Sequence, residues 1–201
     1  MKLRYKIAGG MGVSLALVAI AFGWYISHDS DCIPAAATKP GSETMMAIRH
    51  GCFGGPEVLE LVEVSKPVPI DNEIRVRIEA AAVNPLDWHY MRGTPYIMRL
   101  MGAGIGSPAD MRLGVDYAGV VESVGAEVNR FEPGDRVFGR SSGAFGEYLV
   151  TGQENAVTPI PERTSPEQAA AVPIAGVTAL QALRDTGNLQ PGQKVLINGC
   201  L

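Results

Sequence analysis

The sequence is poor in cysteine and in aromatic residues. Among its 201 residues are 3 cysteines, and Phe, Trp and Tyr together make up 6%. Cys32, Cys52 and Cys200 lie far apart and form no Cys-x-x-Cys pair, so the sequence indicates neither a disulfide framework nor a zinc ribbon. We expect three unrelated thiols, of which Cys32 is the one that could pair with another chain.

An excess of positive charge is also absent. The formal net charge is −4 and no basic cluster is visible, which argues against nucleic-acid binding. Internal repeats are absent as well, and 24 Gly and 14 Pro follow no period. This composition is typical of a globular body with many turns, long enough for one complete domain and part of a second.

Charged residues are missing from residues 7–26, which follow Lys2, Arg4 and Lys6. About 20 apolar residues at about 1.5 Å each match a hydrocarbon core of about 30 Å. The pattern predicts a transmembrane helix within residues 1–28, kept as an anchor that places the body on the non-cytoplasmic side. The alternatives are a cleaved export signal, with a site near residues 35–37, and a buried helix.

The chain after this segment changes character twice. Residues 29–44 are rich in Ala, Pro, Ser, Thr and Gly and predict a linker. Residues 45–164 predict a mostly β, barrel-like domain, because runs of alternating polarity are separated by Gly and Pro turns. The predicted strands are residues 58–64, 73–82, 114–124, 135–138 and 145–150.

From residue 165 onwards the pattern becomes helical and then apolar. Ser165 is placed as an N-cap before Pro166, and residues 176–185 have apolar residues at helical spacing. Residues 194–199 read as a buried parallel strand that runs into Asn and Gly, as before a dinucleotide-binding Gly-rich turn. The fold class is therefore mixed β and α/β, with residues 165–201 as the truncated start of a Rossmann domain.

Several runs, in their order and spacing, resemble the medium-chain dehydrogenase/reductase superfamily, and within it the zinc-free quinone oxidoreductase (zeta-crystallin-like) branch. These runs cover most of the chain from Gly51 to Gly199. They are residues 83–87 with Arg92 and Gly93, residues 114–121 with Val124 and Gly125, Phe131 and residues 134–139, residues 143–148, residues 176–179 and residues 192–199.

The resemblance implies a GroES-like domain followed by a Rossmann domain that binds NADP or NAD. It implies hydride transfer, without zinc, to a small quinone or an α,β-unsaturated carbonyl, and a possible homodimer. Zinc alcohol dehydrogenases have Cys where this chain has Asn84, and Gly-His-Glu where it has residues 114–116. An amide and an isopropyl group do not replace zinc ligands, so we expect no metal.

Three residues are candidates for the site. The resemblance places Asn84 and Thr178 beside the nicotinamide, although Asn84 also fits an extended residue before proline and Thr178 an ordinary helical threonine. His89 stands where related reductases often have Tyr or Lys, so it is the candidate donor to the substrate oxygen; the alternative is a structural imidazole. Asp87 fits a helix cap better than a base.

Two functions remain open at this stage. The first is a fragment of an NAD(P)H-dependent reductase, inactive as this chain because the phosphate turn is missing. The second is a non-catalytic GroES-like binding module tethered to a membrane. The residue that selects NADH or NADPH would lie about 20 residues beyond the missing turn. Residues 95–110, rich in Met and Gly, predict a loop that lines an apolar pocket or covers it.

Overall fold

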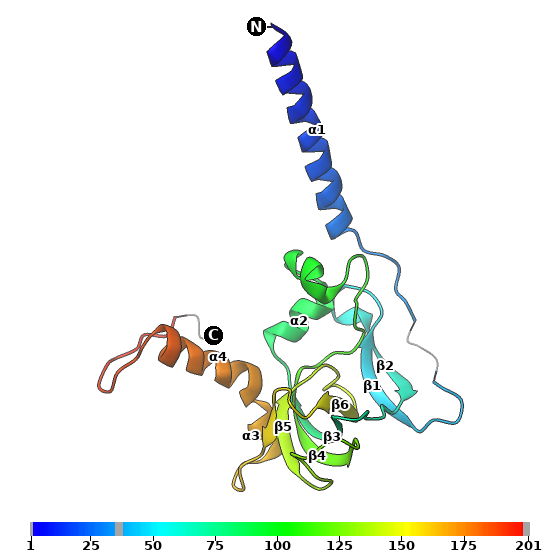
Figure 1. Ribbon diagram of the computed structural model, residues 1–201, viewed down its shortest axis with the longest axis vertical. Helices are drawn as coiled ribbons and strands as arrows, with labels where there is room; N and C mark the ends of the chain where they lie inside the picture. Colours follow the sequence, from blue (N-terminus) through cyan, green and yellow to red (C-terminus); the bar gives the residue numbers. More distant parts are fainter. Residues whose placement is uncertain (1, 35–37, 199–201) are drawn as a thin grey trace.

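The structure is a computed structural model that describes residues 2–34 and 38–198, with side chains in α1 from Val13 onwards. In Figure 1, helix α1 (Lys2–Ser27) stands away from a β body, and α4 (Val177–Leu180) projects from the other end of that body. Helix α2 (Pro85–Arg92) lies at the end of the sheet that faces α1. The β body carries the site described below.

The β body is built on a five-stranded antiparallel sheet in the order β6-β3-β4-β5-β7. The predicted strands are confirmed within a few residues, because alternating polarity places every second side chain on the buried face. Strand β7, which the sequence analysis did not predict, follows directly after the last turn of the body. The bounds are β3 Glu73–Ala82, β4 Asp116–Val124, β5 Arg136–Arg140, β6 Tyr148–Gly152 and β7 Val157–Pro159.

A two-stranded sheet extends this body. Strands β1 (Thr44–His50) and β2 (Leu59–Ser65) pair antiparallel and are separated by a short 3-10 turn, Pro56–Val58. Single bridges from Ala47 to Gly146 and from Arg49 to Arg112 join β1 to the rest of the body. The end of β1 therefore lies beside the loop that follows α2.

The core sits between the sheet and the loops that fold over it. Ile74 and Val76 of β3, Tyr117 and Val121 of β4, and Val137 of β5 are almost completely buried and form one cluster. A second cluster packs helix α3 onto the sheet through small side chains. Its members are Ala118, Ile160, Ala169 and Ala170.

Short helices follow the sheet and begin where the sequence predicts. Ser165 caps α3 (Pro166–Ala170) by accepting from the backbone N–H of Gln168, and the Gln168 side chain completes a capping box. The helix continues through the wider turns Val172–Gly176 and Gln181–Thr186 on either side of α4. The predicted helix over residues 176–185 is therefore confirmed as part of this continuous helical segment.

The predicted terminal strand is not formed. Residues 193–198 adopt no regular structure, and Leu196 is 93% exposed. A parallel strand needs a neighbouring strand for its hydrogen bonds, and the described residues place none beside this run. Residues 199–201, which complete the predicted entry into the Gly-rich turn, lie outside the described residues.

The prediction of a transmembrane helix is wrong. Although α1 has 26 residues, no helix in the described parts of the chain combines the length and the apolar character needed to cross a membrane. Four other predictions depended on this helix and lose their support: the anchor, the membrane contact, the membrane-tethered module and the non-cytoplasmic placement of the body. The predicted cleavage site, residues 35–37, lies outside the described residues.

The expectation of three unrelated thiols is wrong for two of them. Cys32 and Cys52 form an intramolecular disulfide with their Cα atoms 4.4 Å apart. Sequence spacing gave no signal for it, because 20 residues separate the two cysteines. The pairing follows from the path of residues 26–33, which run back along the β body. The backbone N–H of Ile33 donates to the carbonyl of Gly51 there (2.9 Å).

Candidate functional site

Three adjoining hollows run along one side of the β body. The outer hollow, of about 530 Å³, lies between α4 and the edge formed by β5 and β7. It shares Arg140, Asn155 and Ala156 with a central hollow of about 340 Å³. The central hollow shares Tyr90 and Val115, among others, with an inner hollow of about 230 Å³. Together they connect the start of the helical segment to the end of β1.

Asn84 holds the beginning of α2. Its side-chain Oδ1 accepts from the backbone N–H of Leu86 (2.8 Å), and its backbone N–H donates to Oδ2 of Asp87 (2.9 Å). Extended dihedral angles at Asn84 fit the residue before Pro85. The predicted capping role of Asp87 is confirmed by this reciprocal pair. Asn84 therefore has a structural role, and like His89 it is not among the residues that line the three hollows.

Asp116 is the residue that the sequence analysis left without a role. Its Oδ2 accepts from Nδ2 of Asn84 (3.1 Å) and from the backbone N–H of Ile174 (3.3 Å). Asp116 is 1% exposed, and its Oδ1 has no partner among the described residues. Burial raises the pKa of this carboxyl group, and the bonds to Ile174 and Asn84 oppose that shift. One buried carboxylate thus ties α2 to the helical segment.

Thr178 lies one turn beyond Ile174 and lines the outer hollow. Its side chain is exposed, as are those of most of its neighbours in α4. The structure brings Asn84 and the turn before Thr178 together through Asp116, and it places Thr178 where a ligand in the outer hollow would touch it. The predicted place of both residues beside a nicotinamide stays a prediction.

The side chain of His89 is not part of the hollows. Its Nδ1 lies 2.7 Å from the carbonyl oxygen of Thr94, and the side chain lines none of the three hollows. The neighbouring Tyr90 does line two of them. Since a carbonyl only accepts, Nδ1 carries a proton, and the neutral ring has a lone pair at Nε2. His89 is therefore a hydrogen-bond donor at Nε2 only as the imidazolium.

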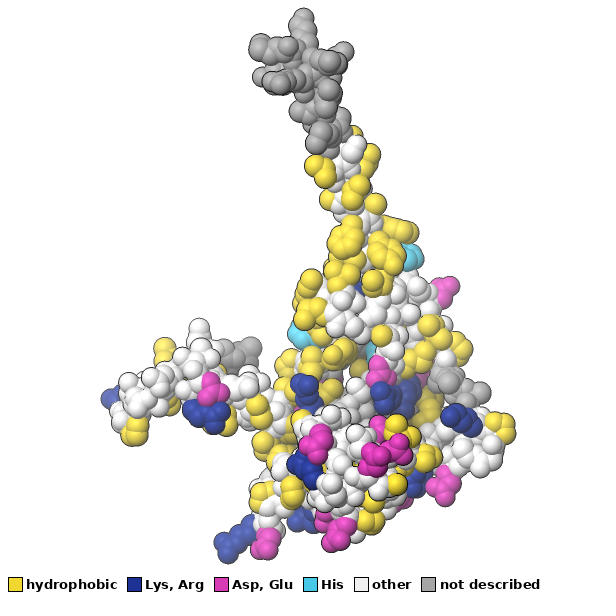
Figure 2. All heavy atoms as spheres, viewed as in Figure 1, with side chains coloured by type: hydrophobic (Ala, Val, Ile, Leu, Met, Phe, Trp, Pro, Cys, Tyr) yellow, Lys and Arg dark blue, Asp and Glu magenta, His cyan; other side chains and the backbone are white. Residues whose placement is uncertain are grey.

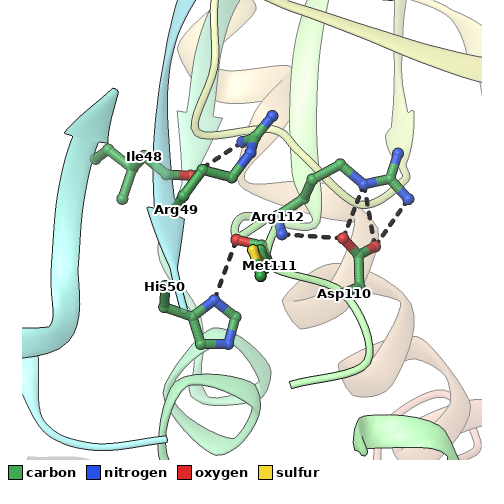
Figure 3. Close-up of polar contacts among 6 residues, drawn as sticks. All are labelled: Ile48, Arg49, His50, Asp110, Met111 and Arg112. Carbon is green, nitrogen blue, oxygen red and sulfur yellow. Dashed lines mark hydrogen bonds and ion pairs between the residues drawn. The ribbon is translucent and has the colours of Figure 1, made fainter. Parts of the chain in front are cut away.

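Polar and apolar groups line the inner hollow in similar measure, and buried residues stand on its walls, of which Figure 3 shows His50. His50, at the end of β1, is 1% exposed, and its Nδ1 lies 3.2 Å from the carbonyl of Met111. Burial lowers the pKa of His50 and raises that of Asp87. At the mouth, Arg112 and Asp110 form an ion pair (2.8 Å) beside Arg49.

The donor set around Asn84 does not fit a catalytic zinc ion. Asn84 offers an amide that is already hydrogen-bonded, and Val115 offers no donor atom. Within residues 2–34 and 38–198, no group of three His, Cys, Asp or Glu side chains could hold a metal ion. The amide N–H of Asn84 and the hydroxyl of Thr178 are groups that hydrogen-bond to neutral polar ligands rather than coordinate zinc.

Comparison with known proteins places this geometry in a family. Residues 70–162 match the family described as alcohol dehydrogenase GroES-like domain. The quinone oxidoreductase of Sus scrofa is 38% identical over 162 residues, which are 79% of this chain and 46% of that protein. The chain thus spans about half the length of the curated relatives it matches.

Solved structures agree with the sequence comparison. The quinone oxidoreductase of Coxiella burnetii superimposes with a TM-score of 0.65 at 31% identity, covering 74% of this chain and 47% of that one. That of Escherichia coli, solved in complex with NADPH, gives 0.58 at 30% identity, covering 72% and 41%. The chain therefore belongs to the quinone oxidoreductase branch of the medium-chain dehydrogenase/reductase superfamily and corresponds to the N-terminal part of its members.

Proposed function

We propose that the chain forms the substrate side and the first helical segment of an NAD(P)H-dependent reductase that reduces quinones or α,β-unsaturated carbonyls without zinc. The observation that carries the proposal is Asp116, which joins Asn84 of the β body to Ile174 of the helical segment. This link fixes Asn84 beside the turn that precedes Thr178. Family membership supports the reaction class. A homodimer of the whole protein is part of the proposal.

The residues named would act by orientation. A bound nicotinamide supplies the hydride. Asn84 would donate its free amide N–H, and Thr178 its hydroxyl, to hold the carboxamide in one direction. The three hollows then give the substrate a path from the mainly apolar outer hollow, through the more polar central hollow, to His50 and Asp87 in the inner hollow.

The proton or hydrogen bond for the substrate oxygen has two candidate donors. We propose His89, which would donate from Nε2 as the imidazolium because Nδ1 is bonded to Thr94. Tyr90 is the neighbouring alternative, since its side chain lines the central and inner hollows. The two are separable by substitution of each side chain in turn.

We also propose that the chain as it stands binds nicotinamide nucleotides weakly. The backbone donors of a Gly-rich phosphate turn are not among its 201 residues. Titration of the purified chain with NADPH, followed by nucleotide fluorescence, is expected to show no saturation in the micromolar range. Micromolar binding would contradict this part of the proposal.

A chimera tests the reaction itself. Residues 45–186 are joined to the complementary C-terminal part of the Escherichia coli quinone oxidoreductase, and NADPH oxidation by a benzoquinone is measured. We expect turnover, with kcat/KM lowered about 10- to 100-fold by Asn84→Ala or His89→Phe and little changed by Tyr90→Phe. A chimera that folds and binds NADPH but reduces no quinone would overturn the proposed function. Loss with Tyr90→Phe alone would reassign the donor.

A further inference from the structure

Residues 26–33, here called the strap, are fastened to the β body at two separate places. One fastening is the buried side chain of Arg99, and the other is the Cys32–Cys52 disulfide. Between them, the backbone N–H of Ser30 donates to the carbonyl of Gly106 (2.9 Å). The strap lies where α1 meets the body in Figure 1.

The buried side chain of Arg99 holds the first fastening through several hydrogen bonds. It is 3% exposed, and its guanidinium donates to the carbonyls of Gly93 (2.9 Å), Ile26 and His28 (both 3.2 Å) and to Oδ1 of Asp29 (2.7 Å). The same group lies over the rings of Phe53 and Tyr96, 4.3 and 5.0 Å from their centroids. Separating the strap here would leave a buried charge with the carbonyl of Gly93 as the one remaining acceptor of these four, which is strongly unfavourable.

The second fastening consists of one covalent bond and few other contacts. Cys32 and its neighbours in the strap are exposed, whereas Cys52 is 5% exposed. Beyond the disulfide, the bonds from Ile33 to Gly51 and from Ser30 to Gly106 hold this half. Backbone hydrogen bonds of an exposed segment contribute little net stability, since water replaces them at low cost. The disulfide therefore decides whether this half stays docked.

Both fastenings attach the strap to segments that also line the inner hollow. Residues 99–112, here called the lining loop, contribute Gly102, Ala103 and Asp110 to the wall of that hollow, among others. Cys52 lies two residues after His50, which lines the same hollow from the other side. The strap thus bridges two walls of one cavity.

We propose that the Cys32–Cys52 bridge is a reversible thiol–disulfide exchange site for a dithiol reductant, and that its cleavage frees the second half of the strap and loosens the lining loop. A thiolate of the dithiol attacks the exposed Cys32 sulfur, breaks the S–S bond and releases Cys52 as a thiolate. The second thiol then displaces Cys32 from the mixed disulfide. Two electrons pass from the dithiol to the protein, and the two protons that the dithiol loses end on the cysteines.

Hydrogen exchange on the full chain tests the proposal. Cys200→Ser removes the third thiol, and the oxidised chain is compared with the same chain in dithiothreitol, with thiol labelling to count reduced cysteines. We expect peptides that contain Ser30, Ile33 and the lining loop to exchange about tenfold faster or more after reduction. Peptides of β3 and β4 should stay unchanged.

Three results would overturn the proposal. The first is full reduction without faster exchange in the strap or the lining loop. The second is reduction that requires denaturant, and the third is faster exchange throughout the β body, which would make the bridge a global structural disulfide. The double variant Cys32→Ser/Cys52→Ser should reproduce the reduced pattern in the absence of reductant.

A glycine pair separates release of the strap from thiol chemistry. A Cβ on Gly51 would lie 1.9 Å from the carbonyl oxygen of Ile33, so Gly51→Ala should displace the strap locally in the oxidised protein. Gly23→Ala is the matched control, because a Cβ there meets nothing within 4 Å. We expect Gly51→Ala alone to raise exchange in the lining loop. An unchanged lining loop in a folded Gly51→Ala protein would overturn the link between strap and cavity.

Discussion

The β body and the helical segment that follows it have similar apolar sequences but opposite surroundings. In the β body, Ile74, Val76 and Val137 are completely buried. In the segment after residue 170, Val177, Leu180 and Leu183 are 38–49% exposed. Figure 2 shows the same contrast along α1, where apolar side chains are exposed in rows. A hydrophobic pattern thus indicates which face of an element can be buried. Whether that face is buried depends on another element that packs against it.

The contrast also separates helices from strands. Residues 172–186 form helical turns although few of their side chains are covered, because a helix closes its hydrogen bonds within itself. Residues 193–198 are equally apolar and form no strand, because a strand needs a neighbour. Asp116 is the main polar tie between the two regions, through Ile174.

The largest difference is expected from truncating matched aliphatic side chains in the two regions. Ile74→Ala should lower the free energy of unfolding by about 3 kcal/mol, because it leaves a cavity in the core. Leu180→Ala, at a side chain that is 49% exposed, should change it by less than about 0.5 kcal/mol. Urea unfolding followed by circular dichroism measures both. Equal losses would show that the helical segment is packed in solution.

A second prediction cuts the tie between the regions. Asp116→Ala removes the acceptor of Ile174 and Asn84 and should raise hydrogen exchange of the Ile174 amide about tenfold. Residues 172–186 should loosen while β3 keeps its protection. Asp185→Asn is the control, since that carboxylate contacts Arg184 of the same region. If Ile174 exchanges at the original rate in Asp116→Ala, the carboxylate does not hold the segment.

The sequence predicted what depends on local pattern and missed what depends on distant contacts. The boundaries of β3 and the capping role of Asp87 follow from alternation and from the spacing around Pro85, whereas the capping role of Asn84 was not predicted. The Cys32–Cys52 disulfide depends on how two distant segments fold together, and no local signal announces it. The transmembrane prediction failed because an uncharged run alone does not establish a spanning helix.

The site divides in the same way. Thr178 lines the outer hollow, and its place beside a nicotinamide stays a prediction, whereas the double role of Asp116 depends on the approach of Ile174. An acidic residue next to the position of a missing zinc ligand was the available signal for Asp116. His50 was missed because a histidine at the end of an edge strand looks ordinary until the lining loop covers it. Both are products of tertiary burial.

The third prediction uses this burial of His50. Because its pKa is lowered in the folded chain, the native state binds fewer protons than the unfolded state. Stability from His50 is therefore present above the unfolded value of about 6.5 and is lost as the pH falls towards the folded value. The slope is at most about 1.4 kcal/mol per pH unit. His50→Gln should remove it from urea midpoints measured between about pH 5 and 7.5. A wild-type midpoint that rises on acidification in this range would contradict the sign.

The smallest effect is expected where the β body is itself exposed. Asp110 pairs with Arg112 at the mouth of the inner hollow, and the two side chains are 40% and 50% exposed. Burial pushes the pKa of Asp110 upwards, but the bonds from Arg112 outweigh it and the pKa is lowered overall. The pair therefore stabilises the fold above the unfolded pKa of about 3.9 and loses this contribution as the pH falls. Asp110→Asn should cost about 0.5 kcal/mol at neutral pH, after allowance for screening by water, and less in about 1 M salt. A loss as large as that of Ile74→Ala would mean that charge at the mouth, rather than burial, separates the two regions.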